Sequence, residues 1–217
     1  MMIDQAESWH RGDHRVLYRA HVVALEEDDV TSPSGELLRR EFCSHPGSVA
    51  VLALDDQARV AVVHQYRHPV QTRLVELPAG LLDVPGEAPL AGAQRELAEE
   101  AGLAADDWAV LADFCSSPGI SDEVTRIYLA RRLHQRARPD GFDVQGEEVD
   151  MGLAWVPLDD LLDVVRAGAV CNTALVLGVT TLRLAMADGV VDALRPGDTP
   201  WPMHDRVQQL KTERGDA

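Results

Sequence analysis

The pattern of apolar and polar positions before residue 70 predicts β-strands joined by turns. The predicted strands are rich in β-branched and aromatic residues and are separated by Pro, Gly, Ser and Asp, which favour turns. They cover residues 14–25, 36–43, 48–54 and 59–66. This part of the chain is therefore expected to form hairpin-like β-structure.

A helical pattern begins at Pro89, where apolar residues recur at spacings of three and four as far as Ala101. Pro89 suits the first turn of a helix, and Gly102 suits the position just after its end. Beyond it, the same criteria predict strands at 108–114, 123–130 and 151–155, helices at 158–167 and 172–187, and an extended tail after residue 195. The mixture predicts an α+β sandwich core from about residue 48, preceded by a small β extension.

Length, composition and charge narrow the class of protein. The length of 217 residues predicts one domain with an extension, or at most two domains. The composition, 46% hydrophobic and 26% charged, is typical of a globular protein. The 20 basic and 36 acidic residues give a net charge of −16, which argues against nucleic-acid or membrane-surface partners. A nucleotide substrate remains compatible, because a divalent cation can supply positive charge locally.

Three cysteines, Cys43, Cys115 and Cys171, are far apart in the sequence and odd in number. Neither a disulfide scaffold nor a zinc knuckle fits this spacing, so we expect small buried side chains in a reducing cytoplasm. The polar N-terminal residues do not resemble a signal peptide, and the longest apolar stretch is too short and too polar to span a bilayer.

The predicted helix at 89–101 carries the candidate chemistry. Glu96 and Glu100 fall on the same face, Glu99 flanks them, and Glu87 lies just before the helix. Carboxylates this close repel each other, and a bound magnesium ion would resolve that repulsion. Arg95 can pair with Glu87 or with another carboxylate and hold it in place. Acidic residues at these spacings are also common on solvated helix faces, so the pattern alone leaves both interpretations open.

The segment GLLDVPGEAPLAGAQRELAEEAGL at 80–103 resembles the Nudix box, GX5EX7REUXEEXGU, in which U is a bulky aliphatic residue. It departs from that pattern by one extra residue between Gly80 and Glu87. Further segments resemble the ADP-ribose pyrophosphatase branch of the Nudix hydrolases, particularly its actinobacterial members. They are VVHQYRHPV at 62–70, ELPAGLLD at 76–83, SSPGISDE at 116–123 and EEVDMGLAWVPL at 147–158.

The resemblance implies a fold and a division of the chain. It implies a Nudix α/β/α sandwich over residues 48–217 and an N-terminal antiparallel β extension over 1–47. It also implies a homodimer in which the N-terminal strands are exchanged. The cofactor implied is Mg²⁺, with Mn²⁺ able to substitute.

Roles for individual residues follow from the same resemblance. The metal ligands would be Glu96, Glu99 and Glu100, together with the backbone carbonyl of Ala79, and Arg95 would position the helix with Glu87. Substrate contacts would come from Arg67, Glu76, Ser121 and Glu123. Glu148 aligns best with the carboxylate that deprotonates the attacking water, with its neighbour Glu147 as the competing candidate and Glu99 next.

The function implied is the hydrolysis of a nucleoside diphosphate sugar, above all of ADP-ribose to AMP and ribose 5-phosphate. The alternatives are another ADP-sugar or GDP-sugar, a dinucleotide, or a non-catalytic Nudix module that senses ADP-ribose. RNA cap processing is less compatible, because the composition offers no basic groove.

Overall fold

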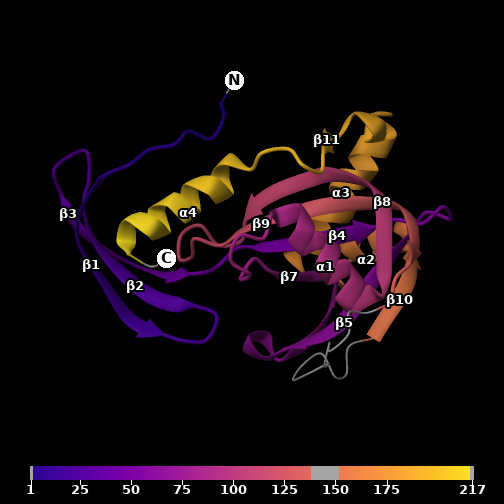
Figure 1. The fold of residues 1–217 in the computed structure, drawn as a ribbon, viewed down its shortest axis with the longest axis horizontal. Helices are drawn as coiled ribbons and strands as arrows, with labels where there is room; N and C mark the ends of the chain where they lie inside the picture. Colours follow the sequence, from indigo (N-terminus) through magenta and orange to yellow (C-terminus); the bar gives the residue numbers. More distant parts are fainter. Residues whose placement is uncertain (1, 138–151, 216–217) are drawn as a thin grey trace. The chain divides into compact units, whose positions relative to one another are not determined.

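The computed structural model describes residues 2–137 and 152–215 (Figure 1). Two compact units make up the chain, and each is described by itself. Unit 1 comprises Met1–Pro46, Cys115–Glu123 and Pro202–Ala217, and unit 2 comprises Gly47–Phe114 and Val124–Trp201. The predicted extension at 1–47 therefore covers only part of unit 1, because two later segments of the chain also belong to it.

Unit 2 contains two sheets. The larger has the strand order β11-β8-β9-β4-β7, in which β4 is parallel to β9 and antiparallel to β7. Its strands are β11 (Arg195–Pro196), β8 (Leu103–Cys115), β9 (Val124–Gln135), β4 (Ser48–Ala53) and β7 (Ala79–Leu81). The smaller sheet is antiparallel and has the order β10-β5-β6. Its strands are β10 (Gly152–Pro157), β5 (Arg59–Arg67) and β6 (Thr72–Glu76).

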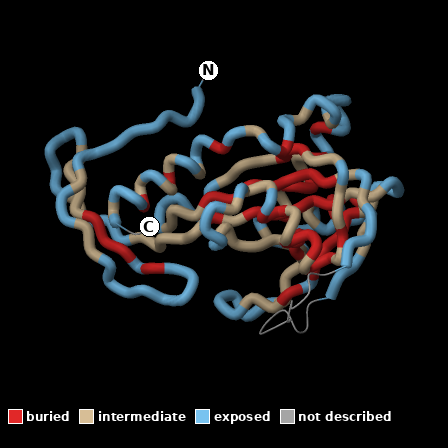
Figure 2. Tube along the Cα trace, in the orientation of Figure 1, coloured by how far each residue is buried: buried red, intermediate tan, exposed pale blue. Residues whose placement is uncertain are grey.

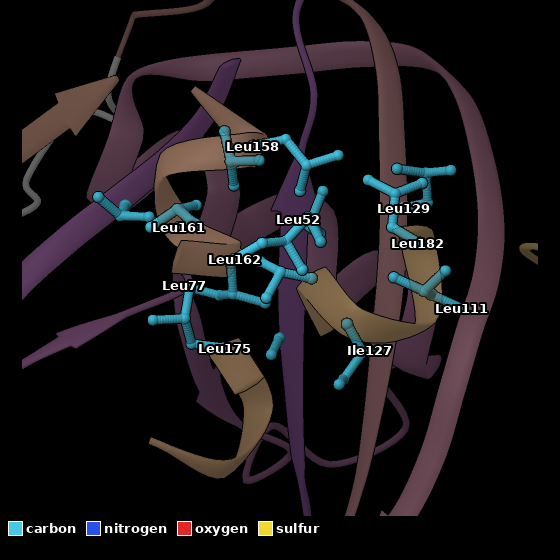
Figure 3. Close-up of a cluster of buried hydrophobic side chains, with 14 of the residues drawn as sticks. Leu52, Leu77, Leu111, Ile127, Leu129, Leu158, Leu161, Leu162, Leu175 and Leu182 are labelled. Atoms are coloured by element: carbon cyan, nitrogen blue, oxygen red, sulfur yellow. The ribbon is translucent and has the colours of Figure 1, made fainter. Parts of the chain in front are cut away.

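Helices cover both faces of the larger sheet. They are α1 (Pro89–Ala101), α2 (Leu158–Arg166) and α3 (Thr173–Ala187), and two 3₁₀ turns lie at His68–Val70 and Val191–Ala193. Along β4, Val49 and Val51 belong to the core that includes residues of α1. Leu52 belongs to the other core, with residues of α2 and α3 (Figure 3). A strand that alternates between two cores is buried on both faces, as β4 is (Figure 2). The predicted α+β sandwich is confirmed.

Unit 1 contains a three-stranded antiparallel sheet and a helix. The sheet has the order β1-β2-β3, and the helix is α4. Their bounds are β1 (His10–Arg19), β2 (Ala24–Thr31), β3 (Leu37–Ser44) and α4 (Pro202–Arg214). The prediction of one strand over 14–25 is wrong, because the chain turns there, where the Ala20 N–H donates to the Val23 carbonyl at 2.9 Å.

The prediction of an extended tail is correct only as far as Trp201. Arg126 donates hydrogen bonds to the carbonyls of Thr199 and Pro200, at 2.6 and 3.3 Å, and its guanidinium lies 4.8 Å from the Trp201 ring centre. From Pro202 the chain is helical instead. This helix has few apolar residues, so it gives almost no periodic signal, although Gln, Leu, Lys, Glu and Arg are strong helix formers.

The described residues correct the expectation for the cysteines. Cys115 and Cys171 are exposed and Cys43 is half-buried, so the expectation that all three cysteines are buried is wrong. Among the described helices, none has the length and apolarity required to cross a bilayer.

Candidate active site

Helix α1 begins and ends where its sequence allows. Pro89 occupies the first helical position, and Gly102 ends the helix with a φ of 64°, a left-handed conformation that glycine adopts at low cost. The Gly102 N–H donates to the carbonyls of Ala98 and Leu97. Ala93, Leu97 and Ala101 are buried in the core. This packing fixes the rotation of the helix and so the direction of its acidic face.

Glu96 and Glu100 lie against the backbone of β7. They are only 8% and 7% exposed, although both are acidic. The Glu100 Oε2 atom accepts a hydrogen bond from the Ala79 N–H at 2.9 Å. The Glu96 carboxylate lies over Gly80, where any Cβ atom would clash with it. A glycine at position 80 is therefore required for the carboxylate to approach the strand.

Arg95 joins the acidic side chains. It donates to both carboxylate oxygens of Glu87 at 3.0 Å, to Glu99 Oε2 at 3.1 Å, and to Glu96 Oε1. It also donates to the Leu81 carbonyl at 3.3 Å. The hydrogen bonds to Glu87, with the negative charge of Glu96, raise the pKa of Arg95 above its ordinary value. The sequence predicted one partner for this arginine, and the structure gives it three carboxylates.

Gly92 is a residue of this cluster that the sequence analysis did not single out. A Cβ atom at this position would lie 3.0 Å from Glu87 Oε2 and 3.1 Å from the Leu82 side chain. The absence of a side chain here leaves room for Glu87 to reach Arg95. A glycine in the middle of a predicted helix costs helix stability and was the available signal.

The oxygen donors of this cluster suit a hard divalent cation. Mg²⁺ binds a few carboxylate oxygens and keeps waters or phosphates in its other positions. Across residues 2–137 and 152–215, no group of three His, Cys, Asp or Glu side chains is arranged to hold a metal. Arg95 instead contacts carboxylates that a cation would bind.

Of the predicted substrate residues, Arg67 and Glu76 lie together. The Arg67 guanidinium donates to both oxygens of Glu76, at 2.9 and 2.7 Å, and the arginine side chain is 41% exposed against 4% for the glutamate. Ser121 and Glu123 belong to unit 1, whereas Arg67 and Glu76 belong to unit 2. Glu147 and Glu148 lie outside the described residues.

A mixed sheet carries an acidic helix whose carboxylates gather over a strand backbone, an arrangement of oxygen donors suited to a divalent cation. The model of the NUDIX domain matches residues 44–171. The chain belongs to the Nudix family, and it is a Nudix hydrolase. Nudix hydrolases in general depend on divalent metal ions.

Three relatives resemble most of the chain. An "ADP-ribose pyrophosphatase" of Mycobacterium tuberculosis is 42% identical over 185 residues, covering 85% of this chain and 87% of that protein. A "Methanol dehydrogenase activator" of Bacillus methanolicus is 36% identical, covering 79% and 90%. An "ADP-ribose pyrophosphatase" of Bacillus subtilis is 34% identical, also covering 79% and 90%.

The fold is shared with a solved structure described as an "ADP compounds hydrolase". It superposes with a TM-score of 0.69 at 19% sequence identity, covering 87% of this chain and 100% of that one. At this identity the likeness supports the fold alone, and it agrees with the predicted Nudix sandwich.

Substituting Gly80→Ala should disrupt the acidic cluster without unfolding the protein. The added Cβ displaces the Glu96 carboxylate, and a displacement near 1 Å in a catalytic site can cost about 10²-fold in rate. We expect a loss of that order in turnover, with an unchanged circular dichroism spectrum.

The matched control for this substitution is Gly12→Ala, in β1. Its Cβ would meet the nearest atoms at 3.5 and 3.7 Å, which is ordinary van der Waals contact. Equal activity of the Gly80→Ala enzyme and the wild type would contradict the placement of Glu96.

Proposed function

We propose that this Nudix hydrolase cleaves nucleoside diphosphate sugars and that its substrate is ADP-ribose, giving AMP and ribose 5-phosphate. The observation that carries the proposal is the acidic face of the helix that bears the family motif. There Glu96 and Glu99 bind Arg95, and Glu100 accepts the Ala79 N–H. The choice of ADP-ribose is supported by the 42% identity to a relative named for that substrate.

The proposed metal ion is Mg²⁺, with Mn²⁺ able to replace it. Glu96, Glu99 and Glu100 would hold it, together with the carbonyl of Ala79, whose N–H binds Glu100. When bound, such ions neutralise the diphosphate and lower the pKa of a coordinated water. Arg95 contributes by holding the like-charged glutamates Glu87, Glu96 and Glu99 close together.

The two members of the Arg67–Glu76 pair have different proposed roles. The exposed guanidinium of Arg67 is suited to contact the phosphates, because its planar N–H groups match phosphate oxygens. Glu76 is almost completely buried and binds that guanidinium through both oxygens, so its role is to orient Arg67. We propose that Ser121 and Glu123 contact the terminal ribose.

A non-catalytic sensor is not favoured by the residues present. A module that only bound ADP-ribose would not need the metal-binding carboxylates, yet Glu96, Glu99 and Glu100 are all retained, and two of them are buried. Burying carboxylates costs free energy unless they are paired or bind metal.

We also propose that the protein is a cytoplasmic homodimer whose two subunits exchange their N-terminal strands. Val16, Leu17 and Tyr18 on β1 are 41%, 48% and 67% exposed, and an apolar group of this kind is suited to a protein contact. The exposed thiols of Cys115 and Cys171 suit a reducing compartment.

Activity should depend on a divalent cation and on its carboxylate ligands. We expect release of AMP and ribose 5-phosphate from ADP-ribose with Mg²⁺ or Mn²⁺ and none in EDTA. Because the metal supplies several kcal/mol, Glu96→Gln and Glu100→Gln should each lower kcat by about 10²-fold or more. Glu36→Gln, in an exposed turn of unit 1, is the matched control. Turnover in EDTA, or a preference for a GDP-sugar or a dinucleotide in the same assay, would contradict the proposal.

Glu148 is the proposed general base. Loss of a general base typically costs about 10²–10⁴ in rate, so Glu148→Gln should lower kcat by that factor. KM should change little, because the interaction is made mainly in the transition state. Steady-state kinetics of Glu147→Gln provide the control, which should stay within a few-fold of the wild type. If the two results are exchanged, Glu147 is the base, and if both variants are active, Glu99 is the next candidate.

The assembly can be measured directly. Multi-angle light scattering at the concentration of the activity assay should give the mass of a dimer. Replacing Leu17 and Tyr18 by Ser should shift the mass toward the monomer, because it removes apolar surface from the contact. A monomer mass for the fully active wild type would refute the dimer.

A further inference from the structure

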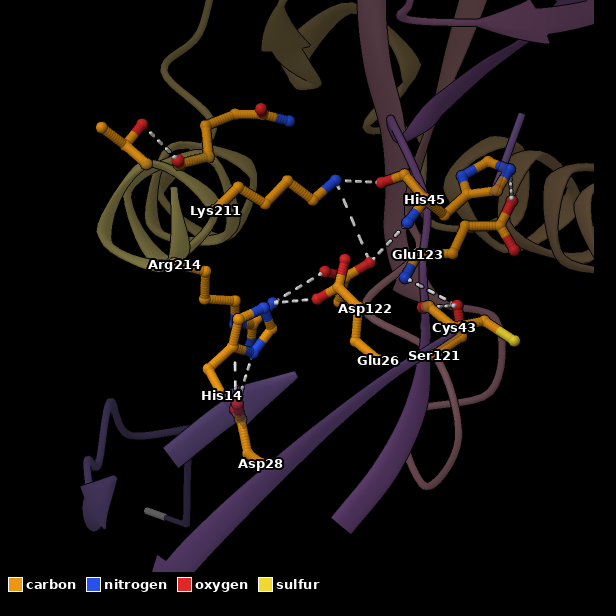
Figure 4. Close-up of polar contacts among 12 residues, drawn as sticks. His14, Glu26, Asp28, Cys43, His45, Ser121, Asp122, Glu123, Lys211 and Arg214 are labelled. Atoms are coloured by element: carbon orange, nitrogen blue, oxygen red, sulfur yellow. Dashed lines mark hydrogen bonds and ion pairs between the residues drawn. The ribbon is translucent and has the colours of Figure 1, made fainter. Parts of the chain in front are cut away.

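A second cluster of charged side chains lies within unit 1 and has no part in the chemistry described above. Its basic members, Lys211 and Arg214, are three residues apart on α4, a spacing that places them on one face of the helix (Figure 4). Their side chains are each only 11% exposed. Lys211 is the chain's single lysine. Two positively charged side chains that are this deeply buried need specific partners.

Asp122 is the residue where these two cations meet. Its Oδ2 atom accepts a hydrogen bond from Arg214 at 3.3 Å, and its Oδ1 atom lies 4.0 Å from the Lys211 ammonium. Oδ1 also accepts the His45 N–H at 2.8 Å. The Asp122 backbone N–H donates to the Cys43 carbonyl at 3.2 Å. Asp122 is therefore fixed through both its backbone and its side chain.

The two cations are in turn anchored on the sheet of unit 1. The Arg214 guanidinium lies 3.8 Å from a carboxylate oxygen of Glu26 and 3.8 Å from one of Asp28, both on β2. It also lies 4.5 Å from the centre of the Phe42 ring, on β3. The Lys211 ammonium donates to the His45 carbonyl. The cluster thus connects α4, the sheet and the segment that contains Asp122.

The residues on either side of Asp122 are the two predicted to contact the substrate. Ser121 Oγ donates to the Cys43 carbonyl at 3.2 Å and accepts the Glu123 N–H at 3.1 Å. The Glu123 carboxylate lies 3.8 Å from His45 Nε2 (Figure 4). Any movement of Asp122 would therefore displace both neighbours.

We propose that Lys211 and Arg214 are positioning residues that act through Asp122 to hold Ser121 and Glu123 for the terminal ribose of the substrate. The inference rests on the proposed function, in which those two residues contact that ribose. Buried ion pairs add little net stability compared with apolar residues of similar size, whereas they can specify one arrangement. Holding a substrate-contacting segment in place is a task of that kind.

The kinetic test uses Asp122→Asn in the full-length enzyme. This variant keeps the acceptor for the His45 N–H and loses the charge that Lys211 and Arg214 share. We expect KM for ADP-ribose to rise about tenfold with kcat nearly unchanged, a loss of about 1.4 kcal/mol in binding. Inhibition by AMP, which lacks the terminal ribose, should be unchanged. Arg214→Ala should act in the same way, and Arg214→Lys should recover part of the affinity.

Arg206→Ala is the matched control, because it removes a cation of α4 outside the cluster. The Arg206 guanidinium donates to the Glu7 carbonyl and to Ser8 Oγ, at 3.1 and 2.8 Å. This variant should bind ADP-ribose as the wild type does. If Asp122→Asn leaves KM unchanged, or weakens AMP and ADP-ribose equally, the positioning role is overturned.

A labelling experiment tests the cluster without any turnover. Because the chain has a single lysine, mass mapping of an amine acylation reagent reports on Lys211 separately from the terminal amine. Acylation of Lys211 should be slow in the native protein, faster in Asp122→Asn and Arg214→Ala, and unchanged in Arg206→Ala. Native labelling as fast as in urea would overturn the inference. Failure of the wild type to hydrolyse ADP-ribose would instead overturn the proposed function, whatever the labelling shows.

Discussion

The acidic face of α1 depends on the guanidinium of Arg95. Glutamates at spacings of one, three and four residues repel each other, and on an isolated helix they would lower its stability. Arg95 contacts Glu87, Glu96 and Glu99 together, and a guanidinium carries its positive charge at any pH the protein meets. The carboxylates can therefore remain close together in the absence of a cation.

The backbone of β7 sets the second constraint on the same carboxylates. Gly80 allows Glu96 to lie over the strand, and the Ala79 N–H holds Glu100. The strand itself is fixed by its pairing with β4, which is buried on both faces. The position of the acidic cluster thus follows from the packing of the core, so catalytic geometry and stability share the same elements.

The sequence alone predicted the helices and strands in which apolar residues recur at a regular spacing. Helix α1 has the predicted bounds, because Pro89, Gly102 and the apolar face between them all agree. The helix α4 was missed, since its two buried residues, Val207 and Lys211, give too weak a pattern.

The candidate site also contains some contacts that local sequence patterns predict and others that they do not. The spacing of the glutamates on α1 predicted that they lie together, because that depends on helix geometry alone. The contacts of Asp122 with His45, Lys211 and Arg214 join residues more than 75 positions apart. No local pattern signals such pairs, so only the folded chain reveals them. The roles of Glu147 and Glu148 stay predictions.

The most direct test of metal binding by α1 is a titration of the protein with Mn²⁺, followed by the electron paramagnetic resonance signal of the free ion. It measures cation binding without substrate or turnover. We expect saturable binding by the wild type and an affinity at least about tenfold weaker in Glu96→Gln, because that carboxylate is a proposed ligand. Equal Mn²⁺ affinity in the two proteins would contradict the assignment of α1 as the metal-binding helix.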